Sequence, residues 1–197
     1  MKIINFIDLY FEQIKSAISN IKINSLKHAI SILNVIKKKK GRLFILGVGG
    51  SAGNASHAVN DFRKLCEIET YAPTDNVSEI TARTNDEGFE TIFLEYLKIS
   101  KFNKKDAILI YSVGGGNLKK NVSINLIKAI SYAKKIGAKS ICIVGKNDGY
   151  AYKNCDVSIF IDIPNKNLIT PISESMQTVI WHLFVSHPEL QSNKTKW

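Results

Sequence analysis

From residue 41 onward, short apolar runs alternate with longer amphipathic segments, and this alternation constrains the fold more than any other feature. The apolar runs predict strands at residues 43–48, 107–112, 140–144 and 157–163, with a weaker strand at 68–72. The amphipathic segments predict helices at residues 51–65, 89–99, 123–136 and 171–185. Near-continuous apolar strands are typical of parallel strands covered on both faces, and the helices between them make βαβ crossovers. The pattern predicts an α/β fold, a doubly wound and mostly parallel five-stranded sheet flanked by helices.

The first 40 residues follow a different pattern, with apolar residues three and four positions apart. This spacing predicts a helix over residues 3–21 and a second helix from Ser25 into the lysine run Lys37–Lys40. We therefore expect an N-terminal helical hairpin at residues 1–40 and an α/β domain at residues 41–197. The two helices carry more apolar surface than one contact would bury. Either they meet another subunit and serve oligomerisation, or they pack as a hairpin on their own domain.

Charge and cysteine content restrict the class of partner. The 27 Lys and Arg against 17 Asp and Glu give a formal net charge of +10. Nucleic-acid binding requires these cations on one face, preferably with aromatic side chains between them, and here they are scattered. We predict no nucleic-acid partner, while the positive charge suits an anionic substrate.

No apolar run reaches the roughly 20 residues that span a bilayer, so we expect no membrane partner. Three cysteines without CxxC spacing indicate a cytoplasmic protein.

Two glycine-rich turns follow predicted strands, at residues 47–51 (GVGGS) and 112–117 (SVGGGN). In sheets of this kind, ligands bind outside the carboxyl ends of the strands. Glycines let backbone N–H groups approach an anion closely, and the N-terminus of the following helix adds a favourable dipole. The hydroxyl groups of Ser51, Ser112 and Ser123 could donate further hydrogen bonds. We interpret the two turns as a binding site for an anion.

Nucleotide-binding motifs are the main competitors for these turns. Gly47, Gly49 and Gly53 give GxGxxxG instead of the dinucleotide pattern GxGxxG, with Glu67 or Glu69 as the candidate ribose-binding acid. The first strand follows forty residues of helix, and the second glycine loop has no role in that scheme. A P-loop is excluded because no Gly-Lys-Ser/Thr follows either turn. A phosphorylated small molecule is the favoured ligand.

Three segments together resemble a known family. They are "GVGGSAGNASH", "DNVSEITARTNDEGFETIF" and "SINLIKAISYAKKIGAKSICIVGKNDG". They resemble the sugar isomerase (SIS) domain, and most closely the bacterial sedoheptulose 7-phosphate isomerases, also called phosphoheptose isomerases. The resemblance implies the SIS fold and a homotetramer with active sites at subunit interfaces. It also implies conversion of sedoheptulose 7-phosphate to D-glycero-D-manno-heptose 7-phosphate, towards nucleotide-activated heptose and surface polysaccharide. Many members carry zinc.

The resemblance also implies which residues form the site. It assigns catalysis to Asp61 and His182, with zinc bound by His57, Asp61, Glu174 and His182. The residues expected to bind substrate are Gly49, Gly50, Ser51, Asn54, Asn85, Asp86, Ser112, Gly114, Gly115, Ser123 and Glu174. Ketose–aldose isomerisation needs a base for the carbon-bound proton and an acid–base partner for ring opening. It also needs a group that stabilises the developing oxyanion.

The chain departs from the family pattern at several of these positions. Val48 stands where the family has Asn, and Asp61 stands where it has a catalytic Glu. The phosphate loop has several extra residues before Ser123. In the last helix the family has Gln and His eight residues apart. An ungapped alignment places Ser173 and Trp181 there, whereas a shift of one residue places Glu174 and His182 there. We prefer the shifted register because it recovers both polar groups.

Simpler interpretations remain for each of these residues. His57 and Asp61, at i and i+4, are as typical of a surface hydrogen-bonded pair as of metal ligands. His182 on an apolar helix would be a core histidine, and Glu174 would stabilise the dipole of its own helix. At the level of the whole chain, the alternative function is a non-catalytic SIS domain that binds a sugar phosphate in a regulatory role.

Overall fold

The computed structural model describes residues 3–196, so residues 1, 2 and 197 of the two predicted domains lie outside the described residues. The N-terminal part consists of α1 (Ile3–Ser19) and α2 (Ile23–Lys38). The remaining elements are, in chain order, β1 (Leu43–Leu46), α3 (Gly50–Cys66), β2 (Thr70–Tyr71), η1 (Pro73–Asp75), α4 (Val77–Glu87), η2 (Phe89–Thr91), α5 (Ile92–Ile99), β3 (Ala107–Ser112), α6 (Ile124–Ile136), β4 (Lys139–Val144), α7 (Tyr150–Asn154), β5 (Val157–Phe160), η3 (Lys166–Leu168) and α8 (Ile169–Ser186).

The described strands form one five-stranded sheet in the order β2-β1-β3-β4-β5. Every pair of neighbours is parallel, which confirms the predicted doubly wound α/β fold. The chain moves outward from β1 to β2 on one side and from β3 to β5 on the other. The order therefore reverses between β1 and β3, and this reversal opens a crevice at their carboxyl ends. Both glycine-rich turns follow these two strands.

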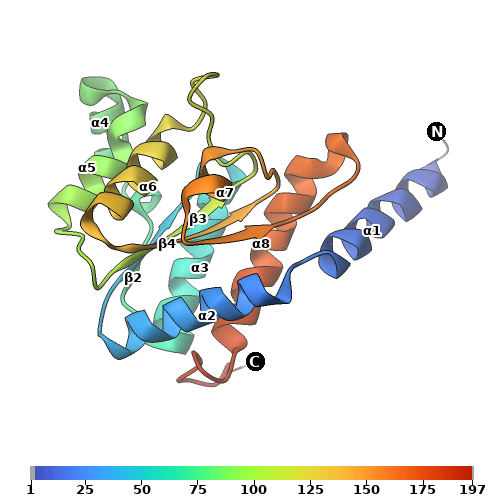
Figure 1. Ribbon diagram of the computed structural model, residues 1–197, viewed down its shortest axis with the longest axis horizontal. Helices are drawn as coiled ribbons and strands as arrows, with labels where there is room; N and C mark the ends of the chain where they lie inside the picture. Colours follow the sequence, from blue (N-terminus) through green and yellow to red (C-terminus); the bar gives the residue numbers. More distant parts are fainter. Residues whose placement is uncertain (1–2, 197) are drawn as a thin grey trace.

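Helices cover both faces of the sheet (Figure 1). Alternate strand residues point to opposite faces, so Ile45, Leu109 and Tyr111 belong to one core cluster, together with residues of α2, α3 and α8. Leu46 and Ile110 belong to the second cluster, which includes residues of α5, α6 and α7. Among residues 3–196, no helix is long and apolar enough to cross a membrane.

The two N-terminal helices differ in how they are buried. Six apolar residues of α2 are buried against the body, whereas among residues 5–19 of α1 the buried core residue is Ala17. In Figure 1, α1 extends away from the rest of the molecule. Its apolar side chains Phe6, Ile7, Phe11 and Ile18 are exposed, Phe11 to 57%. The apolar surface that the sequence predicted is therefore uncovered on α1 and covered on α2.

Several elements differ from the prediction: η1 and η3 were not predicted, and the strand expected over 157–163 ends at Phe160. The helix α4 was not predicted; none of its residues is buried. Its signal is the cap, where the Asn76 side chain accepts a hydrogen bond from the Glu79 N–H. The short helix α7 was also not predicted. The helix expected at 89–99 divides into η2 and α5, which directly follow one another.

A buried ion pair joins β1 and β3 at their amino ends. Asp106 is 2% exposed and directly precedes β3, and its carboxylate accepts hydrogen bonds from the Arg42 backbone N–H and guanidinium at 2.9 and 2.8 Å. The Asn103 backbone N–H donates to the same carboxylate at 3.0 Å. These bonds fix the ends of the two central strands relative to each other.

Removing this carboxylate is expected to destabilise the fold strongly. Asp106→Ala leaves the Arg42 guanidinium and two backbone N–H groups without their acceptor, at a cost of about 3 kcal/mol in the free energy of unfolding. The control is Glu95→Ala, which removes the more exposed pair of Glu95 with Lys98 and should cost under about 1 kcal/mol. Urea unfolding of both variants measures the difference, and equal losses would contradict the prediction.

Candidate active site

Two histidines and one aspartate meet where α3 packs against α8. His57 and Asp61 lie one turn apart on α3, with His57 Nε2 at 3.7 Å from Asp61 Oδ2. His182 on α8 places its Nε2 at 3.4 Å from the same oxygen. One ligand atom from each of the three residues lies within 4.8 Å of the others. The structure thus brings together three of the four residues expected to bind metal.

The burial of this cluster decides between the simple interpretations and the functional ones. Asp61 is only 5% exposed, so it does not form a surface pair. The side chains of His57 and His182 are 57% and 48% exposed, so His182 is not a core histidine. A buried carboxylate lies behind two imidazoles that face solvent. This arrangement leaves both imidazoles accessible to a ligand from outside.

Trp181 is a contact of Asp61 that sequence reasoning did not identify. Its indole Nε1 donates to Asp61 Oδ2 at 3.1 Å, while Asn60 Nδ2 donates to Oδ1 at 3.0 Å. The two competing registers of the last helix had placed either Trp181 or His182 at the site. In the structure both residues reach the same carboxylate from adjacent positions of α8.

The indole ring of Trp181 lies on Tyr111 of β3, with ring centroids 5.9 Å apart and planes 24° apart. The Tyr111 hydroxyl is buried and has no hydrogen-bond partner among the described residues. Burial, and to a smaller extent the charge of Asp61, raise the pKa of Tyr111 well above its ordinary value. Tyr111 therefore stays neutral and supports the indole by packing alone.

Glu174 does not join the cluster in this chain. The residues whose ligand atoms meet are His57, Asp61 and His182, and Glu174 is not among them. The Glu174 carboxylate instead lies against Gly50 at the N-terminus of α3, where a Cβ on Gly50 would come within 2.5 Å of its Oε2. A negative charge is favourable at this helix end.

The first glycine turn is held to α8 by a polar network. Ser51 is 2% exposed and its hydroxyl accepts from Gln177 Nε2 at 3.0 Å. Asn54 Nδ2 donates to the backbone oxygen of Glu174 at 2.9 Å and to Gln177 Oε1 at 2.8 Å. Gly49 adopts a φ of 65° and is exposed. Of the residues predicted here, Gly49 and Gly50 face outward while Ser51 is already engaged, and Gln177 was not predicted.

The second glycine turn is packed more tightly than the sequence suggested. The Ser112 hydroxyl accepts from the Gly115 backbone N–H at 2.9 Å. Gly115 is buried with a φ of 69°, and a Cβ there would lie 3.4 Å from the Ala151 side chain of α7. A Cβ on Gly114, in contrast, would have nothing within 4 Å. Ser112 and Gly115 therefore shape the turn from inside, and Gly114 is its open position.

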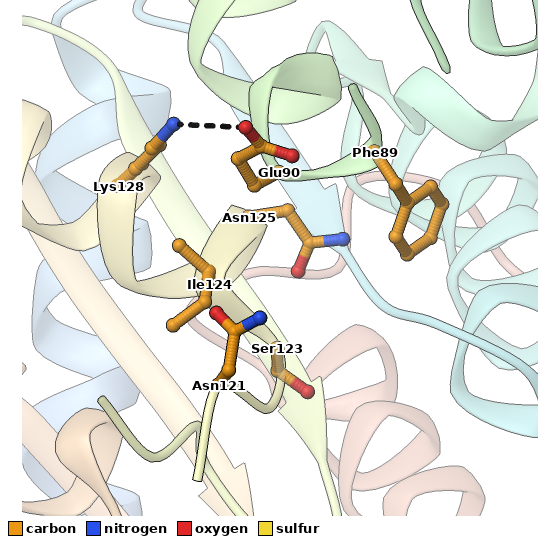
Figure 2. A pocket seen from close by; sticks show the side chains of 7 residues that line it. All are labelled: Phe89, Glu90, Asn121, Ser123, Ile124, Asn125 and Lys128. Atoms are coloured by element: carbon orange, nitrogen blue, oxygen red, sulfur yellow. Dashed lines mark ion pairs between the residues drawn. The ribbon is translucent and has the colours of Figure 1, made fainter. Parts of the chain in front are cut away.

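A pocket of about 480 Å³ lies between η2 and the N-terminus of α6 (Figure 2). Ser123 lines it and makes no cap hydrogen bond with its side chain. Asn125 also lines it, is 1% exposed, and has no partner for its Nδ2 among the described residues. At the rim, Lys128 Nζ lies 3.8 Å from Glu90 Oε1. The sequence singled out Ser123 but not Asn125.

The predicted pair Asn85 and Asp86 is exposed at the end of α4, which leads into η2 and the pocket. Asn85 Nδ2 donates to Asp86 Oδ1 at 2.7 Å. Asp86 is not among the residues whose ligand atoms meet in the cluster of His57, Asp61 and His182.

The dinucleotide interpretation requires an acid at the carboxyl end of β2. Glu67 and Glu69 precede that strand and lie near its amino end, and Glu69 accepts a hydrogen bond from the Tyr71 hydroxyl. Neither can reach a ribose at the first glycine turn, so this interpretation is wrong.

The donor set of the cluster fits a zinc ion. Two imidazole nitrogens and one carboxylate oxygen are the ligands that catalytic zinc sites use, with a further position left open. The exposure of both imidazoles leaves such an open position accessible to a ligand.

Comparison with known proteins places the chain in a family. The family model described as SIS domain matches residues 9–145. The chain is 30% identical to the phosphoheptose isomerase of Nitratiruptor sp. over 163 residues, which cover 80% of this chain and 81% of that relative. It is 34% identical to the lincomycin biosynthesis protein LmbN of Streptomyces lincolnensis over 75% of this chain. That match spans 56% of LmbN.

A solved structure has the same fold over nearly the whole chain. The phosphoheptose isomerase of Francisella tularensis superposes with a TM-score of 0.80, covering 94% of this chain and 97% of that one at 22% identity. With the family model and the curated relatives, this leads to one conclusion. The chain belongs to the SIS domain family, among the relatives named phosphoheptose isomerase.

Proposed function

We propose that this protein is a ketose–aldose isomerase that converts sedoheptulose 7-phosphate to D-glycero-D-manno-heptose 7-phosphate. Its product would serve nucleotide-activated heptose and surface polysaccharide biosynthesis. The observation that carries the proposal is the cluster of His57, Asp61 and His182, with its buried carboxylate between two exposed imidazoles. The relatives named phosphoheptose isomerase support the choice of substrate.

The reaction moves one proton between neighbouring carbons. The Asp61 carboxylate takes the proton from C1 of the open-chain ketose, which leaves an enediolate, and the resulting acid returns a proton to C2. A second proton moves between the oxygens of C1 and C2, so atoms and charge balance. His182 donates a proton to the ring oxygen, and this proton transfer opens the cyclic sugar. Asp61 is one methylene shorter than the glutamate of the family but keeps the carboxylate that this chemistry requires.

His57, Asp61 and His182 would hold a zinc ion. When bound, zinc supplies a Lewis acid next to the substrate carbonyl. Glu174, at the first glycine turn, would accept hydrogen bonds from sugar hydroxyl groups. The backbone N–H groups of Gly49 and Gly50 would donate to sugar oxygens, with Asn54 alongside.

The substrate phosphate would bind at the N-terminus of α6. The N-terminus of α3 already faces the Glu174 carboxylate, so a second anion there would meet a like charge. The N-terminus of α6 instead offers the Ser123 hydroxyl, the unpartnered Asn125 Nδ2 and the nearby Lys128 ammonium. Gly114, Ser112 and Gly115 would shape the neighbouring loop, and Asn85 and Asp86 would approach from α4.

We further propose that active sites form between copies in a homotetramer, and this placement supports the proposal. The cluster belongs to the α3–α8 face of the sheet, whereas Asn125 and Lys128 belong to α6 on the other face. One sugar phosphate would contact both if a second copy brings its pocket to the cluster of the first. The exposed apolar residues of α1 give residues 1–40 a surface for this assembly.

We also propose a cytoplasmic location. Cys66 is a buried free thiol, and burial raises its pKa to about 11, which suits a reducing cytoplasm.

Asp61→Asn tests the function directly. The amide keeps the shape of the side chain but cannot take a proton, so kcat should fall by about 10²–10⁴-fold. Conversion of sedoheptulose 7-phosphate to the aldose, followed by NMR, measures it. His28→Ala, at an exposed histidine of α2 outside the cluster, is the control and should keep the parent rate. A parent that binds the sugar phosphate without converting it would instead indicate the regulatory role.

His182→Ala tests the metal. Loss of one imidazole from a three-residue ligand set should lower bound zinc at least about tenfold. Elemental analysis of protein from zinc-supplemented medium measures it, again with His28→Ala as the control. A parent with full isomerase activity and no bound metal would refute the zinc site while leaving Asp61 as the base.

Asn125→Asp tests the phosphate pocket. The change keeps the side-chain shape and the oxygen that accepts from the Leu126 N–H, but it replaces the unpartnered donor with a negative charge. The KM for the sugar phosphate should rise about tenfold or more, because the carboxylate repels the phosphate. Asn121→Asp makes the same charge change at an exposed rim position and should have a smaller effect. Equal effects of both variants would place the phosphate elsewhere.

A further inference from the structure

We propose that Trp181 is a positioning residue whose indole N–H holds the Asp61 carboxylate in its reactive orientation. The Nε1–Oδ2 distance is 3.1 Å, and the same oxygen faces His182 Nε2 at 3.4 Å and His57 Nε2 at 3.7 Å. Asp61 Oδ2 therefore faces three nitrogen atoms, and the indole Nε1 is the closest of them. For its kinetic consequences the inference rests on the proposed isomerase function.

An aspartate at this position needs such a partner. The terminal torsion of a carboxylate side chain is soft, so packing alone does not choose which oxygen faces the imidazoles. The exposed Asn60 side chain donates a hydrogen bond from Nδ2 to Oδ1, at a distance of 3.0 Å. Trp181 holds Oδ2 from the buried side. With both oxygens bound, the carboxylate cannot rotate without losing a hydrogen bond, and Asp61 is only 5% exposed to water that could replace it.

An indole suits this role better than an imidazole or a hydroxyl group. Its single N–H only donates, so the bond keeps its direction whatever the protonation of the two histidines. Trp181 is 1% exposed and lies on the neutral ring of Tyr111, which belongs to a central strand. The indole donor thus packs on a central strand of the sheet, while the two imidazoles lie on the solvent side of the carboxylate.

Packing alone does not account for this contact. A phenylalanine or leucine could fill the same space between α8 and β3 without placing a donor on Asp61. The adjacent Tyr111 shows the difference, because its hydroxyl is buried without a partner and its ring serves by packing only. Tyr111→Phe is therefore a matched control, since it removes a buried hydroxyl group that has no partner among the described residues and keeps the ring.

The hydrogen bond is tested by NMR without any assay of activity. The sequence contains two tryptophans, so indole labelling with nitrogen-15 gives two N–H signals, and Trp181→Phe assigns one of them. In Asp61→Asn the Trp181 signal should move upfield, because the indole loses a charged acceptor. The signal of the other tryptophan should stay in place. A Trp181 signal that does not move in Asp61→Asn overturns the proposal, even where Trp181→Phe folds poorly.

Kinetics and zinc affinity test the consequence. Trp181→Phe should lower kcat by about 10–100-fold and weaken zinc binding by a similar factor, with the KM for sugar phosphate within about threefold. Tyr111→Phe should leave all three quantities at the parent values. Folded Trp181→Phe with parent kcat and zinc affinity would overturn the proposal. If the parent itself lacks isomerase activity, the proposed function fails, and the indole signal and zinc affinity still decide the role of Trp181.

Discussion

Burying the Asp61 carboxylate between α3 and α8 requires that both of its oxygens find donors inside the protein. Asn60 and Trp181 provide them, and the second of these donors fixes the rotation of α8 about its axis. With Trp181 turned inward onto Tyr111, the next residue, His182, lies at the edge of the interface and faces solvent. The position of the second imidazole thus follows from the buried hydrogen bond.

Two helix N-termini at the carboxyl edge of the sheet have different electrostatic environments. The N-terminus of α3 is next to the Glu174 carboxylate, whereas that of α6 opens into a pocket with unused donors. An anionic substrate would therefore direct its phosphate to α6 and its reacting carbons to α3 and α8. The sequence pattern treats both turns alike, because a glycine-rich turn does not reveal what a distant helix places against it.

Much of the fold could be predicted because its signals are local. Apolar strands such as 107–112 and amphipathic helices such as 123–136 are visible in any window of the sequence. The pair His57 and Asp61 could also be predicted, since their spacing places them on one face of a helix. The roles of Trp181 and Asn125 could not be predicted, because they depend on tertiary structure. Trp181 binds a carboxylate 120 residues away in the sequence, and the Asn125 side chain has a donor that the fold leaves without a partner. Glu174 was expected at the metal by alignment, but its carboxylate lies against Gly50 at the N-terminus of α3.

The placement of cluster and pocket on opposite faces of one sheet has a thermodynamic consequence. Where a second copy completes the site, substrate binding and chain association are linked, and each must strengthen the other by the same factor. Dilution would then weaken substrate affinity as well as separate the chains, and saturating sugar phosphate would oppose that separation. Specific activity would fall as the protein is diluted below the dissociation constant of the assembly, although no residue of the site had changed.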